Sequence, residues 1–305
     1  MTLPRDVYTA GYEYNGTTAV AKVWKNGVPT TLSDGISYAE AHGVFVLGTD
    51  VYVAGSEGAV AKVWKNGVAN VLGTGIISNA TSVFVSGTDV YVTGYDGFSR
   101  NKATIWKNGI PVYLTDGTTN AIANSVFVSG TDVYVTGNDN DGFAAKIWKN
   151  GIAANLPISP SGGCSAYSVF VNGTDVYVAG YISSVGGSIA EIWKNGIPTG
   201  LTNGIKYAEA RSVFVSGNNV FVTGFEDSGS SLNPSVAKYW KNGVETILTS
   251  NNAVGNAIQI SDSNIYVAGS GDISSTNIAQ IWKNGVKTDL TNGINNSEAF
   301  SIFVK

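Results

Sequence analysis

Hydrophobic residues along the chain form short runs in which β-branched and aromatic side chains dominate, separated by polar and glycine-rich segments. One stretch shows the pattern: the runs 125–128 and 132–137 are joined by a short turn, and 144–148 and 153–156 follow. Runs of this length and composition predict β-strands. Asn150-Gly151, between the last two runs, predicts a two-residue hairpin, because both central residues of a type I′ turn need positive φ. We therefore predict a unit of four antiparallel strands and no helix of useful length.

This four-strand unit recurs through the whole sequence. The tetrapeptide Trp-Lys-Asn-Gly begins at Trp24, Trp64, Trp106, Trp148, Trp193, Trp240 and Trp282. These seven positions hold all the tryptophans of the protein. Length alone suggests two domains, at about 150 residues each. A repeat of roughly 43 residues with four strands is instead typical of a β-propeller blade. The sequence thus predicts an all-β fold, a seven-bladed β-propeller in one domain spanning 1–305.

Proline positions and the chain ends predict how the strands are ordered. Pro29, Pro111 and Pro198 fall at the start of the fourth strand. Since proline cannot donate a ladder hydrogen bond, this strand should be the outer edge, and the first strand the inner one. The chain begins just before a second strand and ends, at 300–305, with a first strand. We therefore expect the C-terminal inner strand to pair with the N-terminal strands and close the ring, which hides sheet edges. A parallel solenoid, the alternative, would not need complementary ends.

The repeats resemble those of seven-bladed propeller proteins of bacterial type, over nearly the whole chain. The blade layout is also similar to that of kelch repeats, with Gly-x-Asp-Val-Tyr-Val-x-Gly followed by a tryptophan before the outer hairpin. The kelch double glycine is missing, since Thr136-Gly137 stands there, and Lys follows each Trp where WD40 repeats have Asp. The resemblance implies the fold and no particular activity, because propellers have many functions.

Only one face of such a ring is variable. The turns between first and second strands and between third and fourth strands share one face, which we call the uniform face. It carries the seven lysines of Trp-Lys-Asn-Gly and an Asp or Asn in each blade. The other turns differ in length and sequence and form the variable face. Binding residues concentrate on loops held by a rigid scaffold, and ligands favour concave mouths. We therefore expect a binding site at the mouth of the variable face.

Polar and aromatic residues at the start of the inner strands are the candidate ligand contacts. They are Tyr38, Glu40, His42, Asn79, Asn124, Tyr167, Tyr207, Glu209, Arg211 and Glu298. Carboxylates, amides and tyrosines can hydrogen-bond to and stack on a sugar or a peptide. In the alternative interpretation they only satisfy loop ends and water in the channel. A lone histidine without a second partner is usually structural or solvated.

Three other features have structural explanations that compete with functional ones. The tryptophans could form repeated sugar-stacking sites, but their fixed place before a turn favours a core role. The repeated lysines are expected to be solvated or paired with turn aspartates, which contributes about 0–1 kcal/mol per exposed pair. The loop 138–142 resembles a calcium loop but lacks the later Glu of an EF-hand, and a flexible acidic turn is the alternative.

Composition mainly excludes functions. The chain has 18 Lys+Arg and 22 Asp+Glu, a net charge of −4, with no basic cluster for nucleic acid. Single residues Cys164 and His42 exclude an intrachain disulfide, cysteine-based metal sites and multi-histidine centres. No apolar run approaches the roughly 20 residues of a membrane span. Residues 1–5 show no secretion signal. We expect a monomer without cofactor or metal, and an extracellular or periplasmic location is favoured.

These observations favour a non-enzymatic binding or scaffold propeller that recognises a glycan or protein through the variable face. The first alternative is a structural, designed or surface-layer repeat protein without a small-molecule ligand. The second is a glycan-acting enzyme, which would need mouth carboxylates about 5–10 Å apart. Glu298 and Glu40, in adjacent blades, would suit it better than Glu40 and Glu209, nearly across the ring. Catalysis by Cys164 with His42, from another blade, is disfavoured.

Overall fold

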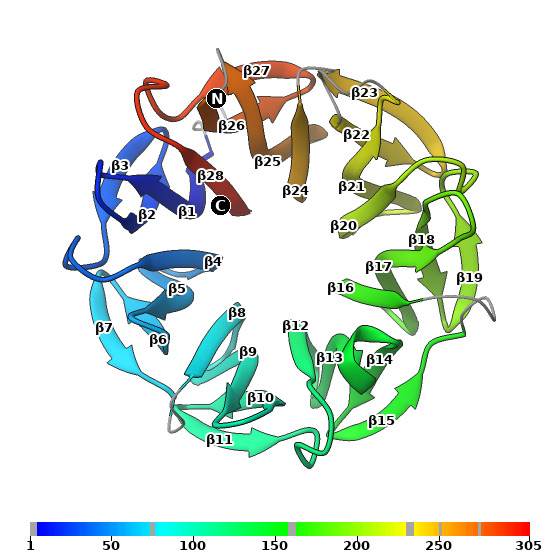
Figure 1. Cartoon of the computed structure of the whole chain (residues 1–305), viewed down its shortest axis with the longest axis horizontal. Helices are drawn as coiled ribbons and strands as arrows, with labels where there is room; N and C mark the ends of the chain where they lie inside the picture. The colour runs from blue at the N-terminus through cyan, green and yellow to red at the C-terminus, as the bar shows by residue number, and fades with distance from the viewer. Residues whose placement is uncertain (1–4, 74–76, 158–162, 230–234, 250–251, 274–275) are drawn as a thin grey trace.

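The computed structural model describes residues 5–73, 77–157, 163–229, 235–249, 252–273 and 276–305. It has seven four-stranded antiparallel sheets arranged in a ring, as Figure 1 shows. The predicted all-β, seven-bladed propeller is therefore confirmed. Within the described ranges, the one helical element is a 3₁₀ turn, η1 (Asn140–Gly142), in a segment that the sequence assigns to a loop.

The strands occupy equivalent places in every blade. The inner strands are β4 (Ala39–Leu47), β8 (Ile77–Ser86), β12 (Ile122–Ser129), β16 (Cys164–Asn172), β20 (Ala208–Ser216), β24 (Ala253–Ser261) and β28 (Ser297–Val304). The second strands are β5 (Asp50–Glu57), β9 (Asp89–Gly97), β13 (Asp132–Asp139), β17 (Asp175–Ser183), β21 (Asn219–Asp227), β25 (Asn264–Ile273) and β1 (Val7–Tyr14). The third strands are β6 (Val60–Lys65), β10 (Asn101–Lys107), β14 (Ala144–Lys149), β18 (Ser188–Lys194), β22 (Ser235–Lys241), β26 (Thr276–Lys283) and β2 (Ala19–Lys25). The outer strands are β7 (Val68–Val71), β11 (Ile110–Tyr113), β15 (Ile152–Asn155), β19 (Ile197–Gly200), β23 (Val244–Thr249), β27 (Val286–Asp289) and β3 (Val28–Thr31).

Ring closure follows the prediction from the chain ends. One sheet has the order β28-β1-β2-β3, so the C-terminal strand pairs with the N-terminal one (Figure 1). In this antiparallel pair Thr9 lies opposite Ile302. The N–H of Lys305 donates to the carbonyl of Asp6 at 2.9 Å, beyond the end of β28. The closing blade therefore has the same architecture as the six continuous ones.

The Asn-Gly turns of the uniform face have the predicted conformation. In all seven, Asn has φ between 51° and 53° and Gly between 79° and 82°. The asparagine side chain adds a second function. In one blade Asn150 Oδ1 accepts from the N–H of Val133 at 2.8 Å, while its Nδ2 donates to Asp132 at 2.8 Å. Because Asp132 belongs to the neighbouring turn, each asparagine ties together the two turns of its blade on this face.

The tryptophans form the core between blades. All seven have no exposed surface. Trp64, for example, packs in one cluster with Ala10 and Ala21 of the preceding blade and with Ala39 and Ala41 of its own. The predicted core role is confirmed, and burial leaves no tryptophan face for a sugar.

A row of partly exposed phenylalanines on the inner strands lines the centre of the ring. It consists of Phe303, Phe45, Phe84, Phe127, Phe170 and Phe214. Neighbouring ring centroids are 4.8–5.0 Å apart, and the rings are tilted by about 50° to one another, a favourable arrangement for aromatic pairs. The seventh position holds Gln259, as the departure of this repeat from Val-Phe-Val predicts.

The outer strands leave a repeated apolar surface exposed. The residue that follows each Asn-Gly turn is Val or Ile, and it is 68–77% exposed in every blade. We call these seven residues the apolar crown: Val28, Val68, Ile110, Ile152, Ile197, Val244 and Val286. The crown belongs to the uniform face, because it borders the turns between third and outer strands.

Candidate functional site

Each inner strand carries a β-bulge at the same place, near the variable face. In the β4 blade the register passes from Ala41–Gly55 to Gly43–Ala54, which leaves His42 without a partner on β5. A bulge bends the strand and re-aims the extra side chain. The extra residues, which we call the bulge column, are His42, Thr81, Asn124, Tyr167, Arg211, Asn256 and Phe300.

A glycine at the same place on each second strand, preceded by Val-x in six blades and by Thr9-Ala10 in β1, makes this bulge possible. A Cβ built on Gly55 would lie 2.0 Å from the carbonyl oxygen of Glu40, and a Cβ on Gly137 would lie 1.9 Å from that of Ile122. Such distances cannot occur, so only glycine lets the bulged strand approach so closely. The bulge on each inner strand therefore depends on the glycine at the facing position of the second strand.

The residue after this glycine completes the mouth, and the sequence interpretation missed it. Tyr12 pairs in register with Glu298, and Phe225 with Glu209. The seven members of this third column are Tyr12, Ser56, Tyr95, Asn138, Tyr181, Phe225 and Ser270. The sequence does mark this position, because it directly follows a glycine that recurs in every repeat. That the position lies at the mouth, however, depends on the register between the inner and second strands.

The bulge column joins the blades in a closed circle. Each member contacts the next blade. Three of them donate to a backbone carbonyl there: Thr81 to Ala123 (2.6 Å), Asn124 to Ala166 (2.9 Å) and Asn256 to Ala299 (2.9 Å). The other four contact a side chain of the next blade: His42 Nε2 with Asn79 Nδ2 (3.3 Å), Tyr167 with Glu209 (3.2 Å), Arg211 with Asn256 (2.8 Å), and the Phe300 ring with that of His42 (5.0 Å between centroids). The mouth is thus held by contacts between blades. The alternative interpretation, in which these residues satisfy the scaffold, accounts for part of their role.

One half of the mouth is organised around Glu209. This carboxylate accepts hydrogen bonds from the hydroxyls of Tyr207 (2.5 Å) and Tyr167 (3.2 Å) and from Nε of Arg211 (3.0 Å). Glu209 is only 4% exposed, whereas Tyr207 is 42% exposed. The guanidinium of Arg211 also lies 5.1 Å from the ring centroid of Phe225. Glu209 therefore positions its neighbours, and Tyr207 is the accessible surface of this arginine half.

The other half has carboxylates that form no ion pair with a Lys or Arg among the described residues. Tyr38 donates to Glu40 Oε1 at 2.6 Å, and His42 Nε2 lies 3.5 Å from Glu40 Oε2. Burial lowers the pKa of His42 to about 4, so the ring is neutral at pH 7. Glu298 accepts from Asn256 Nδ2 at 2.9 Å. Among the described residues, neither Glu40 nor Glu298 has a Lys or Arg within ion-pair distance. The charge of Arg211, which shares Asn256 with Glu298, nevertheless acts to lower the pKa of Glu298.

Burial and the unpaired carboxylates shift the pKa values of the residues in this acidic half. Burial raises the pKa of Glu40 and of Glu298. Burial together with the charges of these two glutamates raises the pKa of Tyr12 to about 12. Tyr12 also packs near Phe300, with ring centroids 5.8 Å apart. The acidic half is an acceptor-rich surface with aromatic walls, and its tyrosine hydroxyls stay protonated.

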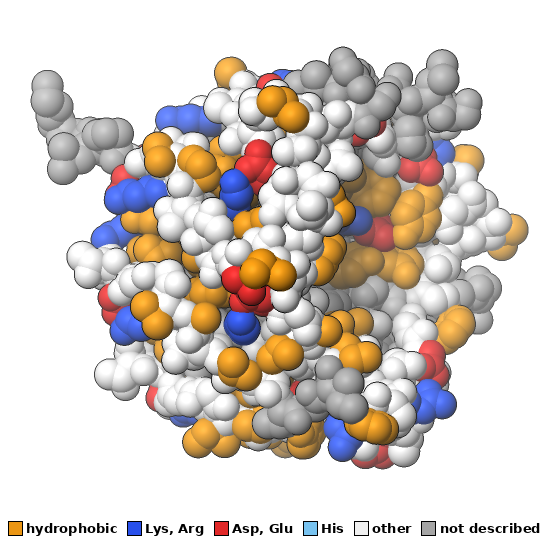
Figure 2. Space-filling model, turned by 60° about the vertical axis from the view of Figure 1, so that its left-hand side comes forward, with side chains coloured by type: hydrophobic (Ala, Val, Ile, Leu, Met, Phe, Trp, Pro, Cys, Tyr) orange, Lys and Arg blue, Asp and Glu red, His pale blue; other side chains and the backbone are white. Residues whose placement is uncertain are grey.

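The structure groups the predicted residues into two sets. Tyr38, Glu40, His42, Asn79 and Glu298 belong to the acidic half, and Tyr167, Tyr207, Glu209 and Arg211 to the arginine half. Asn124 belongs to neither, since it bonds the Ala166 carbonyl and Asn138. Figure 2 shows the hollow of the ring, where hydrophobic side chains surround acidic and basic ones.

Charges on the uniform face pair as the sequence predicts. Lysine ammonium groups lie 2.7–2.8 Å from turn aspartates in five blades: Lys25–Asp6, Lys65–Asp50, Lys107–Asp89, Lys149–Asp132 and Lys194–Asp175. Each of these lysines also lies over a tyrosine ring of its own blade. In the β20 and β24 blades Asn219 and Asn264 replace the aspartate.

The loop 138–142 and Cys164 are engaged in structural contacts. Asp139 pairs with Lys146 at 3.0 Å, and Asp141 accepts from Asn120 at 2.8 Å. In the part of the chain that the structure describes, no group of three or more His, Cys, Asp or Glu is arranged to hold a metal ion. The Cys164 sulfur accepts from the N–H of Ala145 at 3.0 Å, and burial raises the pKa of its thiol.

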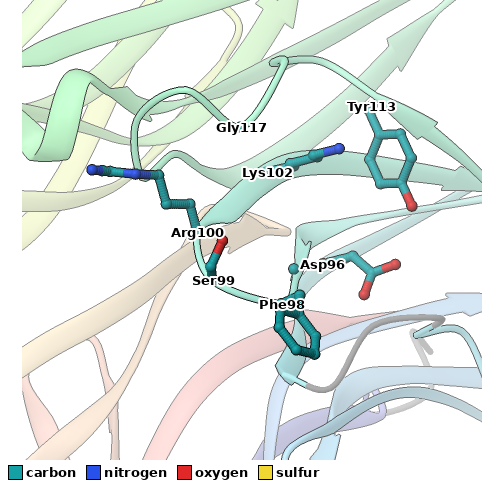
Figure 3. A pocket seen from close by; sticks show the side chains of 8 residues that line it. Asp96, Phe98, Ser99, Arg100, Lys102, Tyr113 and Gly117 are labelled. Carbon is teal, nitrogen blue, oxygen red and sulfur yellow. The ribbon is translucent and has the colours of Figure 1, made fainter.

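A pocket of about 350 Å³ lies away from the mouth, in the β8 blade (Figure 3). Lys102 lies over the Tyr113 ring, 4.8 Å from its centroid. Arg100 points away from both, and its Nη1 is 3.5 Å from Asp141. The lining side chains therefore do not converge on one point.

Comparisons with known proteins do not identify a family for this chain. No protein-family model matches the sequence, and no curated protein matches it. Among solved structures, that of YjhT is similar with a TM-score of 0.49 and 12% sequence identity, over 84% of this chain and 98% of that chain. No helix among the described residues is long and apolar enough to cross a membrane.

Proposed function

We propose that the protein is a non-enzymatic binding module that recognises a glycan at the mouth of the variable face. The observation that carries the proposal is the pair of Tyr-x-Glu motifs in opposite halves of the mouth. Tyr38 is 55% and Tyr207 is 42% exposed, and each hydroxyl is fixed by the glutamate two residues later. An exposed ring held in one orientation is a stacking surface that costs little conformational entropy on binding.

The hydrogen-bonding capacity of the mouth fits a polyhydroxylated ligand. Among the described residues, neither Glu40 nor Glu298 forms an ion pair with Lys or Arg, so their oxygens can accept hydrogen bonds from hydroxyl groups. The arginine half supplies donors as well. A sugar offers hydroxyl donors and acceptors at its edge and apolar C–H groups on its faces, and these match the carboxylates and the aromatic rings.

The rigidity of the mouth supports a role in ligand binding. Each bulge is fixed by its glycine, and the bulge column links all blades in a circle. A site whose groups are already ordered loses less entropy on binding. The same rigidity would serve a structural or surface-layer repeat protein, so ligand binding has to be measured.

The test is binding of the full chain to an array of immobilised glycans, followed by calorimetry with the glycans retained. We expect the double variant Tyr38→Ala/Tyr207→Ala to lose at least tenfold in affinity. The matched control is Phe143→Ala, which removes an aromatic ring that is 60% exposed and lies outside the mouth. Absence of any binder on the array, or equal affinity of the double variant, would contradict the proposal.

A further inference from the structure

Two pockets on the uniform face occupy equivalent positions between blades. One, of about 250 Å³, lies between the blade closed by β28 and the β4 blade. The other, of about 290 Å³, lies between the β12 and β16 blades. Their walls correspond residue by residue: Tyr8 with Tyr134, Leu32 with Leu156 and Val53 with Val178. The pocket is therefore a feature of the repeat.

The side chains that line this pocket favour an apolar occupant. Most of its lining side chains are aliphatic or aromatic, and its lysine and turn asparagine are already paired within the chain. Lys25 is bound to Asp6 at 2.8 Å. Asn66 accepts from the N–H of Val51 at 2.8 Å and donates to Asp50 at 2.9 Å. A charged or strongly hydrated group would gain no new partner there, whereas an aliphatic side chain would lose its exposure to water.

The apolar crown supplies such side chains on the same face. Its members are Val in four blades and Ile in three, so the repeats differ here while staying aliphatic. The next position of the outer strand shows no such restriction, since Pro29, Ala69, Glu245 and Lys287 all occur there. Exposure of about 70% in every blade means that nothing in the described part of the chain covers the crown.

We propose that the uniform face is a self-association surface, through which two copies of the chain meet face to face and crown residues of each enter inter-blade pockets of the other. A second copy presents the same number of aliphatic groups at the same spacing, so many contacts can form at once. A face that pairs with itself about a two-fold axis closes at two copies.

The size and charge of the face fit this partner. Seven aliphatic residues that are about 70% exposed present on the order of 700 Å² per copy, near the roughly 800 Å² per partner of a standard interface. Five of the seven turn lysines are neutralised by their own aspartates, so the faces can approach without strong repulsion. Lys241 and Lys283, beside Asn219 and Asn264, are the exceptions, so rotations that bring these blades of the two copies together are disfavoured.

The dimer leaves both variable faces outward, because the mouth and the crown lie on opposite faces of the ring. Two mouths in one particle would bind a polymeric or surface ligand with increased avidity. The proposal does not require the mouth to bind a glycan, and it departs from the monomer expected from the sequence.

Sedimentation velocity of the full chain from 1 to 500 μM tests the proposal. We expect a concentration-dependent dimer for the natural sequence. The variant Ile110→Lys/Ile152→Lys/Ile197→Lys should sediment as a monomer throughout, with at least a tenfold weaker self-association. These residues are 69–77% exposed, so circular dichroism should show an unchanged fold.

The matched control places three lysines on the other face. Ile36, Ile205 and Ile294 are 71–83% exposed and lie in the loops before inner strands. We expect Ile36→Lys/Ile205→Lys/Ile294→Lys to dimerise like the natural chain. A natural chain that stays monomeric at 500 μM, a crown variant that still dimerises, or a control variant that becomes monomeric would each overturn the proposal.

Discussion

Gln259 binds the backbone of Val304 with both ends of its side-chain amide. Its Oε1 accepts from the Val304 N–H at 2.7 Å, and its Nε2 donates to the Val304 carbonyl at 3.4 Å. Where six blades have a phenylalanine in the central row, this blade ties the inner strand β24 to the C-terminal strand β28. The exception thus occurs at the junction where the ring is closed by strands from the two ends of the chain.

Gln259→Ala should loosen this junction. The loss of two hydrogen bonds to a largely buried backbone is expected to lower the free energy of unfolding by about 1–3 kcal/mol. Urea denaturation measures the change. Asn70→Ala, on an exposed outer strand, is the control and should stay within about 0.5 kcal/mol of the natural chain. An equal, small effect of both substitutions would show that Gln259 does not secure β28.

Gly137→Ala tests the coupling of glycine and bulge. Its Cβ would lie 1.9 Å from the Ile122 carbonyl oxygen, so the inner strand must move, and we expect a loss of at least about 3 kcal/mol. Gly87→Asn is the control, because Gly87 is in a turn with φ of 59° and open space around it. Asparagine tolerates this left-handed conformation, and its cost should stay below about 1 kcal/mol. Thermal melting that ranks the two variants in the opposite order would contradict the account of the bulge.

Glu191 predicts a dependence of stability on pH. It is 4% exposed, and its Oε1 has no hydrogen-bond partner among the residues that the structure describes. It occupies the position where the β4, β12 and β20 blades and the blade closed by β28 have a lysine paired with an acid. Burial raises its pKa from 4.5 to about 7. Because the folded state favours the protonated form, this stability is fully present below pH 4.5 and is lost as the pH rises through 7.

Glu191→Gln should remove that dependence. Gln280 holds the equivalent position in the β24 blade, where its amide donates to Asp289 at 3.0 Å, so the blade accepts this side chain. The variant should gain about 2–3 kcal/mol in unfolding free energy over the natural chain between pH 5 and pH 8. Urea denaturation at both pH values measures it. A constant difference between the two proteins would mean that Glu191 titrates normally.

The two glutamates of the Tyr-x-Glu motifs should respond differently to removal of their charge. Glu209→Gln leaves Arg211 without its carboxylate in a partly buried site, and we expect a loss of about 2–4 kcal/mol. Glu40→Gln removes a carboxylate that has no cation, so stability should be unchanged or slightly higher. Denaturant unfolding of both variants at pH 7 provides the comparison, and equal losses would remove the distinction between the two halves of the mouth.

Much of the fold could be predicted because its determinants are local and repeated. Asn150-Gly151 needs only its own backbone conformation to form the hairpin, and Pro29 cannot lie inside a sheet, whatever surrounds it. Seven copies of Trp-Lys-Asn-Gly, together with complementary chain ends, then predict a closed ring of seven blades. The uniform-face ion pairs were predictable for the same reason, since lysine and aspartate lie in neighbouring turns of one blade.

For the mouth, the sequence predicted which residues are present but not the contacts between them. The sequence by itself determined which residues lie at or just before the start of the inner strands, and these include Tyr38, Glu40, Tyr207 and Glu209. Only the tertiary structure decided that Glu209 is closed off by Arg211 and Tyr167 while Glu40 keeps its charge unbalanced. The physical reason is that these partners depend on the bulge, which re-aims a side chain by one residue of register, and on contacts between blades about 40 residues apart in sequence.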